Sequence, residues 1–410
     1  MSKPIYLDNS ATTPVDERVL KAMRPYFGSK FGNPSSIHGF GQTALAAVDS
    51  ARQTVAQFLN CTAEEVIFTS GATEADNLAI FGVIRGLKKQ RTGNLHLITS
   101  VIEHPAVLEP VKALAKQGVE VTYLSVKANG IIDIAELKRS IKDNTVLVSL
   151  MYVNSEVGSV QPIREAGKII KKINENRFKQ WRETRPAIRG ARPSVIYFHT
   201  DAVQAVNFFN CDTKYLQLDL LSLSGHKIYG PKGIGALFVK SGVPLRAIQL
   251  GGHHEKNKRS GTLNVPAIVG LGQAIKLLDK KSVIANNQQI AKLRKKLVEG
   301  ITKNIPRVIF NTALANATPA HAHFSFPGAE GEAILIALDL AGIAVSTGSA
   351  CAARDLKASA VLLAMGITEE IAHSSIRFTL GKYTTASEIN RVIKILPPLV
   401  KKLRQMAPEL

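Results

Sequence analysis

Short runs of β-branched and apolar residues alternate with longer amphipathic segments from about residue 66 to residue 239. The short runs predict strands at 66–69, 95–100, 121–124, 146–151, 195–199, 219–223 and 235–239. Between them, apolar residues recur at helical spacing at 74–87, 105–116, 134–141 and 162–173. Strands and helices in alternation are typical of an α/β fold, in which helices cover both faces of a mixed, mostly parallel sheet.

The pattern changes after about Gly261. A long helical stretch reaches about residue 304, and strand candidates follow at 308–310, 323–326, 343–346 and 375–379. We therefore expect two domains: a large α/β domain over residues 15–261, and a smaller α+β domain made of residues 1–14 and 262–410. A basic stretch at 177–193, which contains the only tryptophan, Trp181, interrupts the pattern before the strand at 195–199.

The charge balance is unusual: 52 lysines and arginines against 32 acidic residues give a formal net charge of +20. Such an excess is typical of proteins that bind nucleic acid or membrane surfaces. Most of it lies in three stretches, at 168–192, 276–307 and 391–404, and two of these have the apolar spacing of amphipathic helices. Because bases on the outer face of such helices are usually only solvated, we expect no direct nucleic-acid binding.

The three cysteines, Cys61, Cys211 and Cys351, are too few for a disulfide framework, and none belongs to a C-x-x-C pair. This usage is typical of a reducing compartment. The N-terminal residues lack the apolar core of a signal peptide, and no run of 18 apolar residues occurs. The expected location is therefore the cytoplasm, with no membrane attachment.

Polar residues follow three of the predicted strands, at the edge where open α/β sheets bind ligands. Residues 70–73 join the first strand to a helix, so free backbone N–H groups and the Thr73 hydroxyl can bind an anion. Asp201 and Gln204 follow the strand at 195–199. Lys227 follows the next strand in a glycine-rich turn, where partial desolvation would make its amine more nucleophilic.

An anion site, a carboxylate and a lysine at successive strand ends together match the needs of pyridoxal 5′-phosphate (PLP). The phosphate needs N–H and hydroxyl donors, the pyridine nitrogen needs a carboxylate that keeps it protonated, and the aldehyde needs an amine. Each feature alone also fits an ordinary helix cap or surface turn. Their combination predicts a PLP-dependent enzyme.

The chain resembles the cysteine desulfurases of iron-sulfur cluster assembly and nitrogen fixation, in the class V aminotransferase group, over essentially its whole length. The resemblance is carried, in order, by YLDNSATTP (6–14), FGNPSS (31–36), FTSGATE (68–74), EHPAV (103–107), HTDAVQ (199–204), residues 222–235, RSGT (259–262), GSAC (348–351) and SSIRF (374–378). It implies the PLP-dependent transferase fold type I. It also implies that sulfur is removed from L-cysteine, giving L-alanine and a persulfide that passes to acceptor proteins for iron-sulfur cluster assembly or tRNA thiolation.

The same resemblance implies roles for individual residues. Lys227 would bind the cofactor covalently, Asp201 would pair with the pyridine nitrogen, and Gln204 would bond the ring hydroxyl. His104 would stack on the ring and move protons. The remaining expected cofactor contacts are Ala72, Thr73, Ser155, Ser224 and His226, joined by Thr262 from the neighbouring subunit of a homodimer.

Arg377, with Asn33, would clamp the carboxylate of the substrate, a task that suits a bidentate guanidinium. Cys351 lies in the small-residue stretch 346–353, which is typical of a mobile loop. As a thiolate it could attack the sulfur of a cysteine substrate and keep it as a persulfide. Cys61 and Cys211, near apolar neighbours, fit inert buried residues instead. A transient iron-sulfur cluster on the Cys351 loop stays open as a family-level alternative.

Three features depart from the family pattern. Ser155 occupies the position of a second asparagine that normally bonds the cofactor, which puts cofactor affinity in question. His253 replaces a glycine near the expected substrate entrance, and the basic stretch at 177–193 lengthens a connection that is short in relatives. That stretch is a candidate docking surface for an acidic partner.

Other functions are less compatible with the sequence. An aminotransferase or lyase would not need Cys351 in its loop, and an RNA-binding relative, suggested by the charge, has no RNA-binding motif. Residues 39–44 approach a dinucleotide fingerprint but follow no strand. The pairs His253–His254 and His321 with His323 lack a third ligand at zinc-like spacing, so we expect no metal site.

Overall fold

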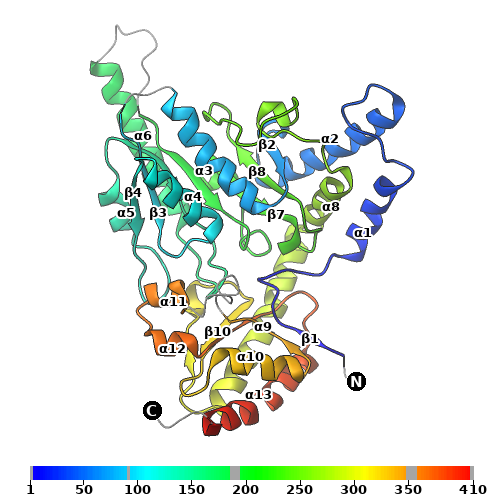
Figure 1. Ribbon diagram of the computed structural model, residues 1–410, viewed down its shortest axis with the longest axis vertical. Coiled ribbons are helices and arrows are strands. Elements are labelled where there is room, and N and C mark those ends of the chain that lie inside the picture. Colours follow the sequence, from blue (N-terminus) through cyan, green and yellow to red (C-terminus); the bar gives the residue numbers. More distant parts are fainter. Residues whose placement is uncertain (1–2, 90–92, 185–193, 348–357, 407–410) are drawn as a thin grey trace.

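A seven-stranded sheet forms the centre of the computed structural model, which describes residues 3–89, 93–184, 194–347 and 358–406 (Figure 1). The strand order is β2-β8-β7-β6-β5-β3-β4. The strands are β2 (Val66–Thr69), β3 (His96–Ser100), β4 (Glu120–Leu124), β5 (Thr145–Ser149), β6 (Tyr197–Asp201), β7 (Leu220–Ser224) and β8 (Gly235–Val239). Strands β7 to β4 run parallel, while β8 is antiparallel to β7 and β2. The predicted mixed, mostly parallel sheet is confirmed.

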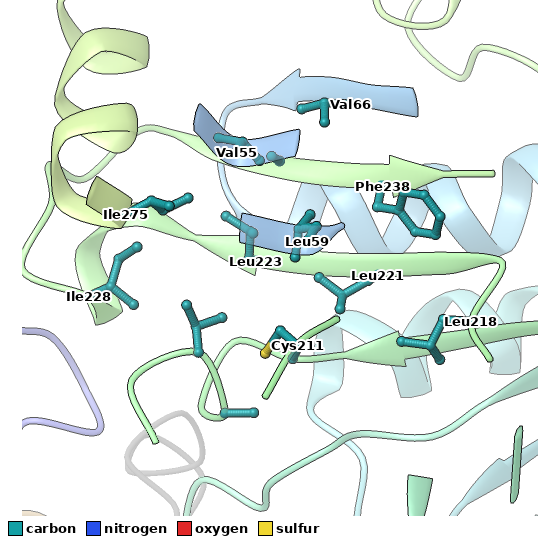
Figure 2. Close-up of a cluster of buried hydrophobic side chains, with 14 of the residues drawn as sticks. Val55, Leu59, Val66, Cys211, Leu218, Leu221, Leu223, Ile228, Phe238 and Ile275 are labelled. Atoms are coloured by element: carbon teal, nitrogen blue, oxygen red, sulfur yellow. The ribbon is translucent and has the colours of Figure 1, made fainter. Parts of the chain in front are cut away.

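Helices cover both faces of this sheet because successive side chains of a strand point to opposite faces. The helices are α2 (Gly39–Leu59), α3 (Ala72–Lys88), α4 (Pro105–Lys116), α5 (Ile134–Ser140), α6 (Ile163–Thr184) and α8 (Val265–Lys276). Helices α3 and α4 share an apolar layer with Ile67 of β2 and Leu237 of β8. Helices α2, α6 and α8 share another with the alternate residues, Val66 and Phe238. Figure 2 shows part of this second layer, with Ile275 of α8 near the sheet.

Helix α8 follows the expected domain boundary in sequence but packs closely on α2. A Cβ atom on Gly272 would lie 2.8 Å from the Cβ of Ala51, so the two helices can approach this closely only with glycine at that position. The apolar side of α8 belongs to the same buried cluster as the large sheet. The division into residues 15–261 against 1–14 and 262–410 stays a prediction, and this packing favours a boundary after α8.

The smaller part of the molecule contains a three-stranded antiparallel sheet of β9 (Ile309–Phe310), β10 (His321–Ser325) and β12 (Ser375–Thr379), in the order β12-β10-β9. Strand β1 (Ile5–Tyr6) pairs in parallel with β11 (Ile343–Ala344), so the N-terminal residues lie beside this part of the chain. Three helices pack beside these strands: α9 (Lys280–Asn304), α10 (Gly331–Leu340) and α13 (Ala386–Met406) (Figure 1).

Two helices differ from the predicted ones. The stretch that we expected to be helical up to about residue 304 is two helices, α8 and α9, separated at residues 277–279. Helix α6 continues past the predicted end at residue 173 to Thr184, and so includes the first part of the basic stretch; residues 185–193 lie outside the described part of the chain. Among the described helices, none has both the length and the apolar composition needed to cross a bilayer.

Candidate active site

A cavity of about 620 Å³ lies at the ends of β2, β3, β5, β6 and β7, where the residues after each strand meet the N-terminal arm and β12. Most of the residues singled out from the sequence line it: Ala72, Thr73, His104, Ser155, Asp201, Gln204, Ser224, His226, Lys227 and Arg377. Asn33 and Thr262 are exposed and do not line the cavity of their own chain. Cys351 lies outside the described residues.

Lys227 ends a short 3₁₀ helix (Gly225–Lys227) that directly follows β7. Its Nζ donates hydrogen bonds to the backbone carbonyls of Ser10 (2.5 Å) and Ala11 (2.7 Å) in the N-terminal arm. The arm is held in place by Thr13, whose N–H and hydroxyl both donate to the carbonyl of His226 at 2.9 Å. Residues far apart in sequence therefore fix the amine inside the cavity.

Asp201 ends strand β6 and is 8% exposed. Its Oδ1 accepts the backbone N–H of Val203 at 2.9 Å. Burial raises the pKa of this carboxyl above its usual value, although that hydrogen bond and the nearby His104 and Lys227 act in the opposite direction. A carboxylate with this surrounding can accept a hydrogen bond from a protonated ring nitrogen.

His104 is the N-cap residue of α4, and its Nδ1 accepts the backbone N–H of Ala106 at 3.1 Å. Burial lowers the pKa of His104. The neutral ring therefore carries its proton on Nε2, because Nδ1 is occupied as an acceptor. This arrangement leaves one titratable nitrogen for proton transfer in the cavity.

The anion site predicted at residues 70–73 is the N-terminus of α3. Its N-cap residue, Gly71, provides no side-chain cap, so the first N–H groups of the helix are available to a ligand. Position 235, at the start of β8, faces this turn and must also be glycine, since a Cβ atom on Gly235 would lie 2.7 Å from the Gly71 carbonyl carbon. Ser224 and His226 line the cavity together with this turn, and burial lowers the pKa of His226 to about 4.

Arg377 lies on β12, is 4% exposed and borders the cavity. Its Nη1 donates to the carbonyl of Ser155 (3.0 Å) and its Nη2 to Oδ1 of Asp8 (2.8 Å). Its Nε has no hydrogen-bond partner among the described residues. The guanidinium is thus fixed in orientation and keeps donors for a carboxylate ligand.

The matched family and relatives agree with this geometry. Residues 5–179 and 180–392 match the aminotransferase class-V family. The chain is 42% identical over 412 residues to "Cysteine desulfurase IscS" of Dictyoglomus turgidum, covering all of this chain and 97% of the relative. The chain belongs to the cysteine desulfurases. It is also 46% identical to "Cysteine desulfurase, mitosomal" of Trachipleistophora hominis, with 98% of this chain and 88% of the relative covered.

Solved structures of the family have the same fold. A "NIFS-LIKE PROTEIN" superposes with a TM-score of 0.87 at 35% identity, covering 98% of this chain and all of the other. The structure named "SspA in complex with cysteine" superposes with a TM-score of 0.78 at 34% identity, covering 93% of this chain and all of the other. The predicted resemblance and fold class are confirmed.

Cysteine desulfurases of the class-V group depend on PLP, and the cavity fits that cofactor. Asp201 offers a carboxylate for the ring nitrogen, the uncapped start of α3 offers N–H groups for the phosphate, and Lys227 offers an amine. Among the described residues, no group of three or more histidine, cysteine or acidic side chains could hold a metal ion. His321 and His323 are buried, with Nδ1 of His321 at 2.6 Å from the Thr318 hydroxyl.

Several cavity residues of this desulfurase were not assigned a role from the sequence. The carbonyls of Ser10 and Ala11 bind Lys227, although the arm itself belongs to a recognised segment. Three acids, the buried Asp76 and Glu103 and the partly buried Glu156, also line the cavity. An acid inside an amphipathic helix, as at Asp76, resembles a solvated position in sequence, so no pattern could have identified it.

Proposed function

We propose that the chain is a PLP-dependent cysteine desulfurase in which Lys227, Asp201, His104 and Arg377 form the active site and Cys351 receives the sulfur. The observation that carries this proposal is the convergence of the four described residues on one cavity, in a chain that matches cysteine desulfurases over its whole length. L-Cysteine would be the substrate, L-alanine the product, and acceptor proteins would take the sulfur.

When bound, PLP supplies an electron sink that weakens the bonds at the α- and β-carbons of an amino acid. The protein supplies position and protons. Arg377, fixed by Asp8 and Ser155, binds the substrate carboxylate. His104 holds a transferable proton on Nε2, and the Ser10 and Ala11 carbonyls bind the Lys227 ammonium whenever that amine is not in covalent use.

Sulfur transfer needs the thiolate of Cys351. The thiolate attacks the sulfur of the substrate, an S–S bond forms and the C–S bond breaks, and the electron pair of that bond stays with the substrate carbon. Protonation of that carbon then gives alanine. A second thiolate, on an acceptor protein, can attack the outer sulfur of the persulfide and regenerate Cys351.

A homodimer is part of this proposal. Phe27, Phe31, Ile37 and Phe40 are 57–94% exposed and follow each other in the segment that runs from the end of α1 (Glu17–Met23) into the first turn of α2. An exposed apolar group of this size marks a protein interface. Asn33 lies in the same segment and, like the exposed Thr262, does not line its own cavity, which supports contributions of both to the site of a second copy.

Membership of the family indicates that an acceptor protein takes the sulfur. A cluster scaffold protein and a tRNA-thiolation relay are both compatible with a persulfide on Cys351. We propose a reducing compartment such as the cytoplasm, because a free nucleophilic thiol requires one.

The first experiment tests the cofactor and the nucleophile. The chain reconstituted with PLP should be yellow and should release equal amounts of sulfide and alanine from L-cysteine in the presence of a thiol reductant. Lys227→Ala should lose the visible absorption band and the activity, whereas Lys240→Ala, which removes a partly exposed lysine paired with Asp219, should keep both. Cys351→Ala should keep the band and lose most sulfide release.

Failure of PLP binding and failure of the Cys351 test have separate consequences. A chain that binds no PLP after reconstitution is not a PLP-dependent desulfurase. Sulfide release by Cys351→Ala at the wild-type rate would leave the enzyme class intact and remove Cys351 from its proposed role.

A further inference from the structure

A second carboxyl, that of Asp76, lies buried at the cavity that also contains the carboxylate assigned to the cofactor ring. Asp76 is on α3, borders the cavity and has no exposed surface. Neither of its oxygens has a hydrogen-bond partner among the described residues. The nearest cationic candidate is Nε2 of His199, at 3.6 Å from Oδ1. Its position therefore provides almost nothing that would stabilise a negative charge.

The groups that face Asp76 do not compensate a charge on it. His199, on β6, is fully buried, with Nδ1 at 2.8 Å from the Ser149 hydroxyl and Nε2 at 3.0 Å from the Ser222 hydroxyl. Burial lowers the pKa of His199 to about 3, so its ring is neutral. Ser222, on β7, is uncharged. Its hydroxyl lowers the pKa of Asp76, but burial raises that pKa by more.

The other titratable neighbours of Asp76 are two acids. Asp201 lies at the end of β6, and Glu103 follows β3; both raise the pKa of Asp76 after burial, the largest cause. Glu103 is itself 4% exposed, accepts the Ser100 hydroxyl (2.6 Å) and the Met151 N–H (3.0 Å) through Oε1, and has a pKa raised to about 8 by burial. Carboxyls that share a desolvated site cannot all ionise.

Hydrogen bonds decide where the proton resides in the Asp76–Asp201 pair. Asp201 accepts the N–H of Val203 at 2.9 Å, and the nearby Lys227 favours its charged form. Neither oxygen of Asp76 has a hydrogen-bond partner among the described residues, and the ring at 3.6 Å, that of His199, is neutral. The charged form is therefore stabilised on Asp201, and the proton is left on Asp76.

We infer that Asp76 is a neutral carboxylic acid at neutral pH and a positioning residue, which keeps the single negative charge of the pair on Asp201. Asp76, as a neutral acid, then does not compete with Asp201 for the ring nitrogen of the cofactor. The cofactor part of this inference depends on the proposed function; the protonation of Asp76 does not, since it concerns the chain alone.

The protonation can be tested on the cofactor-free chain. An aspartate in the unfolded chain has a pKa of about 3.9, so a native Asp76 that keeps its proton makes folding less favourable as pH rises from about 4 toward its native pKa. Asp76→Asn removes this dependence. The folded-to-unfolded ratio of the variant relative to wild type, measured by urea unfolding, should rise between pH 5 and pH 8, at most about tenfold per pH unit.

Asp143→Asn, the same change at an exposed aspartate, is the matched control and should show no such trend. A constant offset between Asp76→Asn and wild type is compatible with any packing defect of the amide, so the slope is the readout. A ratio that stays flat or falls with pH would mean that Asp76 is ionised, and would overturn the inference.

The second arm measures PLP affinity by titrating the apo variants. Asp76→Asn should bind PLP within about threefold of wild type, because it replaces one neutral group by another. Asp201→Asn should bind at least about tenfold more weakly, because it removes the charge itself. Equal losses in the two variants would contradict the assignment. If wild type bound no PLP, the proposed function would fail, while the unfolding arm would still decide the state of Asp76.

Discussion

Ser155 serves the site through its backbone, which explains how the position tolerates a short side chain. Its carbonyl accepts hydrogen bonds from Nη1 of Arg377 (3.0 Å) and from the hydroxyl of Ser10 (2.7 Å), while the residue borders the cavity. Any residue supplies that carbonyl. The side chain is therefore free to differ from the asparagine that the family resemblance leads us to expect.

Restoring that asparagine should tighten cofactor binding. The amide of Ser155→Asn reaches further into the cavity and adds about one hydrogen bond, so the Kd for PLP should fall roughly two- to tenfold. Absorbance titration of the apo chain measures it. Ser155→Ala is the control and should bind within about twofold of wild type, since the carbonyl is unchanged. A weaker Kd for the asparagine variant would show that the position has no room for the amide.

A residue of the active site can be predicted from the sequence when it lies at the end of a predicted strand or a few residues after it. Asp201 ends β6 and Lys227 follows β7, and the two come together because these neighbouring strands end at one edge of the sheet. Asp76 is different, since its burial depends on how α3 lies on the sheet, which the sequence pattern does not contain. The lysine contacts of Ser10 and Ala11 likewise require the packing of the N-terminal arm.

One short turn beside the sheet contains three successive residues with left-handed backbone: Glu255, Lys256 and Asn257, with φ values of 42°, 55° and 61°. The turn is held by Glu255, which is 8% exposed, pairs with Arg52 at 2.5 Å and accepts the N–H of Phe68 at 2.8 Å. These buried contacts impose a conformation that disfavours side chains with a Cβ atom.

Glycine in the middle of this turn should stabilise the protein. Lys256→Gly removes the left-handed penalty and should raise the free energy of unfolding by roughly 0.5–1 kcal/mol, measured by urea unfolding at pH 7. Lys256→Ala keeps the Cβ atom and should give no such gain. If alanine and glycine stabilised equally, loss of the lysine charge and not backbone strain would be the cause.

Helix ends show where sequence patterns lose their predictive power. Helix α6 continues to Thr184 although its apolar spacing weakens, because Arg177 donates to the carbonyls of Thr145 (3.1 Å) and Ser194 (3.0 Å). Such tertiary contacts leave no periodicity in the sequence. The break before α9, in contrast, has a local cause, since the Asp279 side chain caps the helix by accepting the Ser282 N–H at 3.0 Å. That capping residue could have been used to predict the break.

At the scale of the whole molecule, the excess positive charge and the active site are separate. The basic stretches lie largely on α6, α9 and α13, and none of the described residues that line the cavity belongs to those helices. The cavity has its own cations, Lys227, Lys232 and Arg377. The chemistry therefore does not require the net charge of +20, which stays available for contacts with other molecules.

The two parts of the molecule are joined around the cavity by polar contacts of the N-terminal arm. Asp8 pairs with Arg377 of β12, and the N–H of Ser10 donates to the Thr379 hydroxyl at 2.9 Å. Asp16, the N-cap residue of α1, accepts Nζ of Lys382 at 2.6 Å. Hydrogen bonds from Arg18, and then Lys382, hold the pKa of the Asp16 carboxyl well below its usual range.

Asp16→Asn should therefore destabilise the protein in a pH-dependent way. The side chain of Asp16 is 5% exposed, and losing its charge-assisted bonds should lower the free energy of unfolding at pH 7 by about 2 kcal/mol. Because the native pKa lies well below the unfolded value of about 3.9, wild type begins to lose this advantage as pH falls below about 5, and the loss continues down to the native pKa. Urea unfolding of both chains from pH 7 to pH 3.5 should show the gap narrowing at the acid end. A gap that stays constant would mean that the asparagine variant suffers only from altered packing at the start of α1, and that the charge of Asp16 does not help to join the two parts.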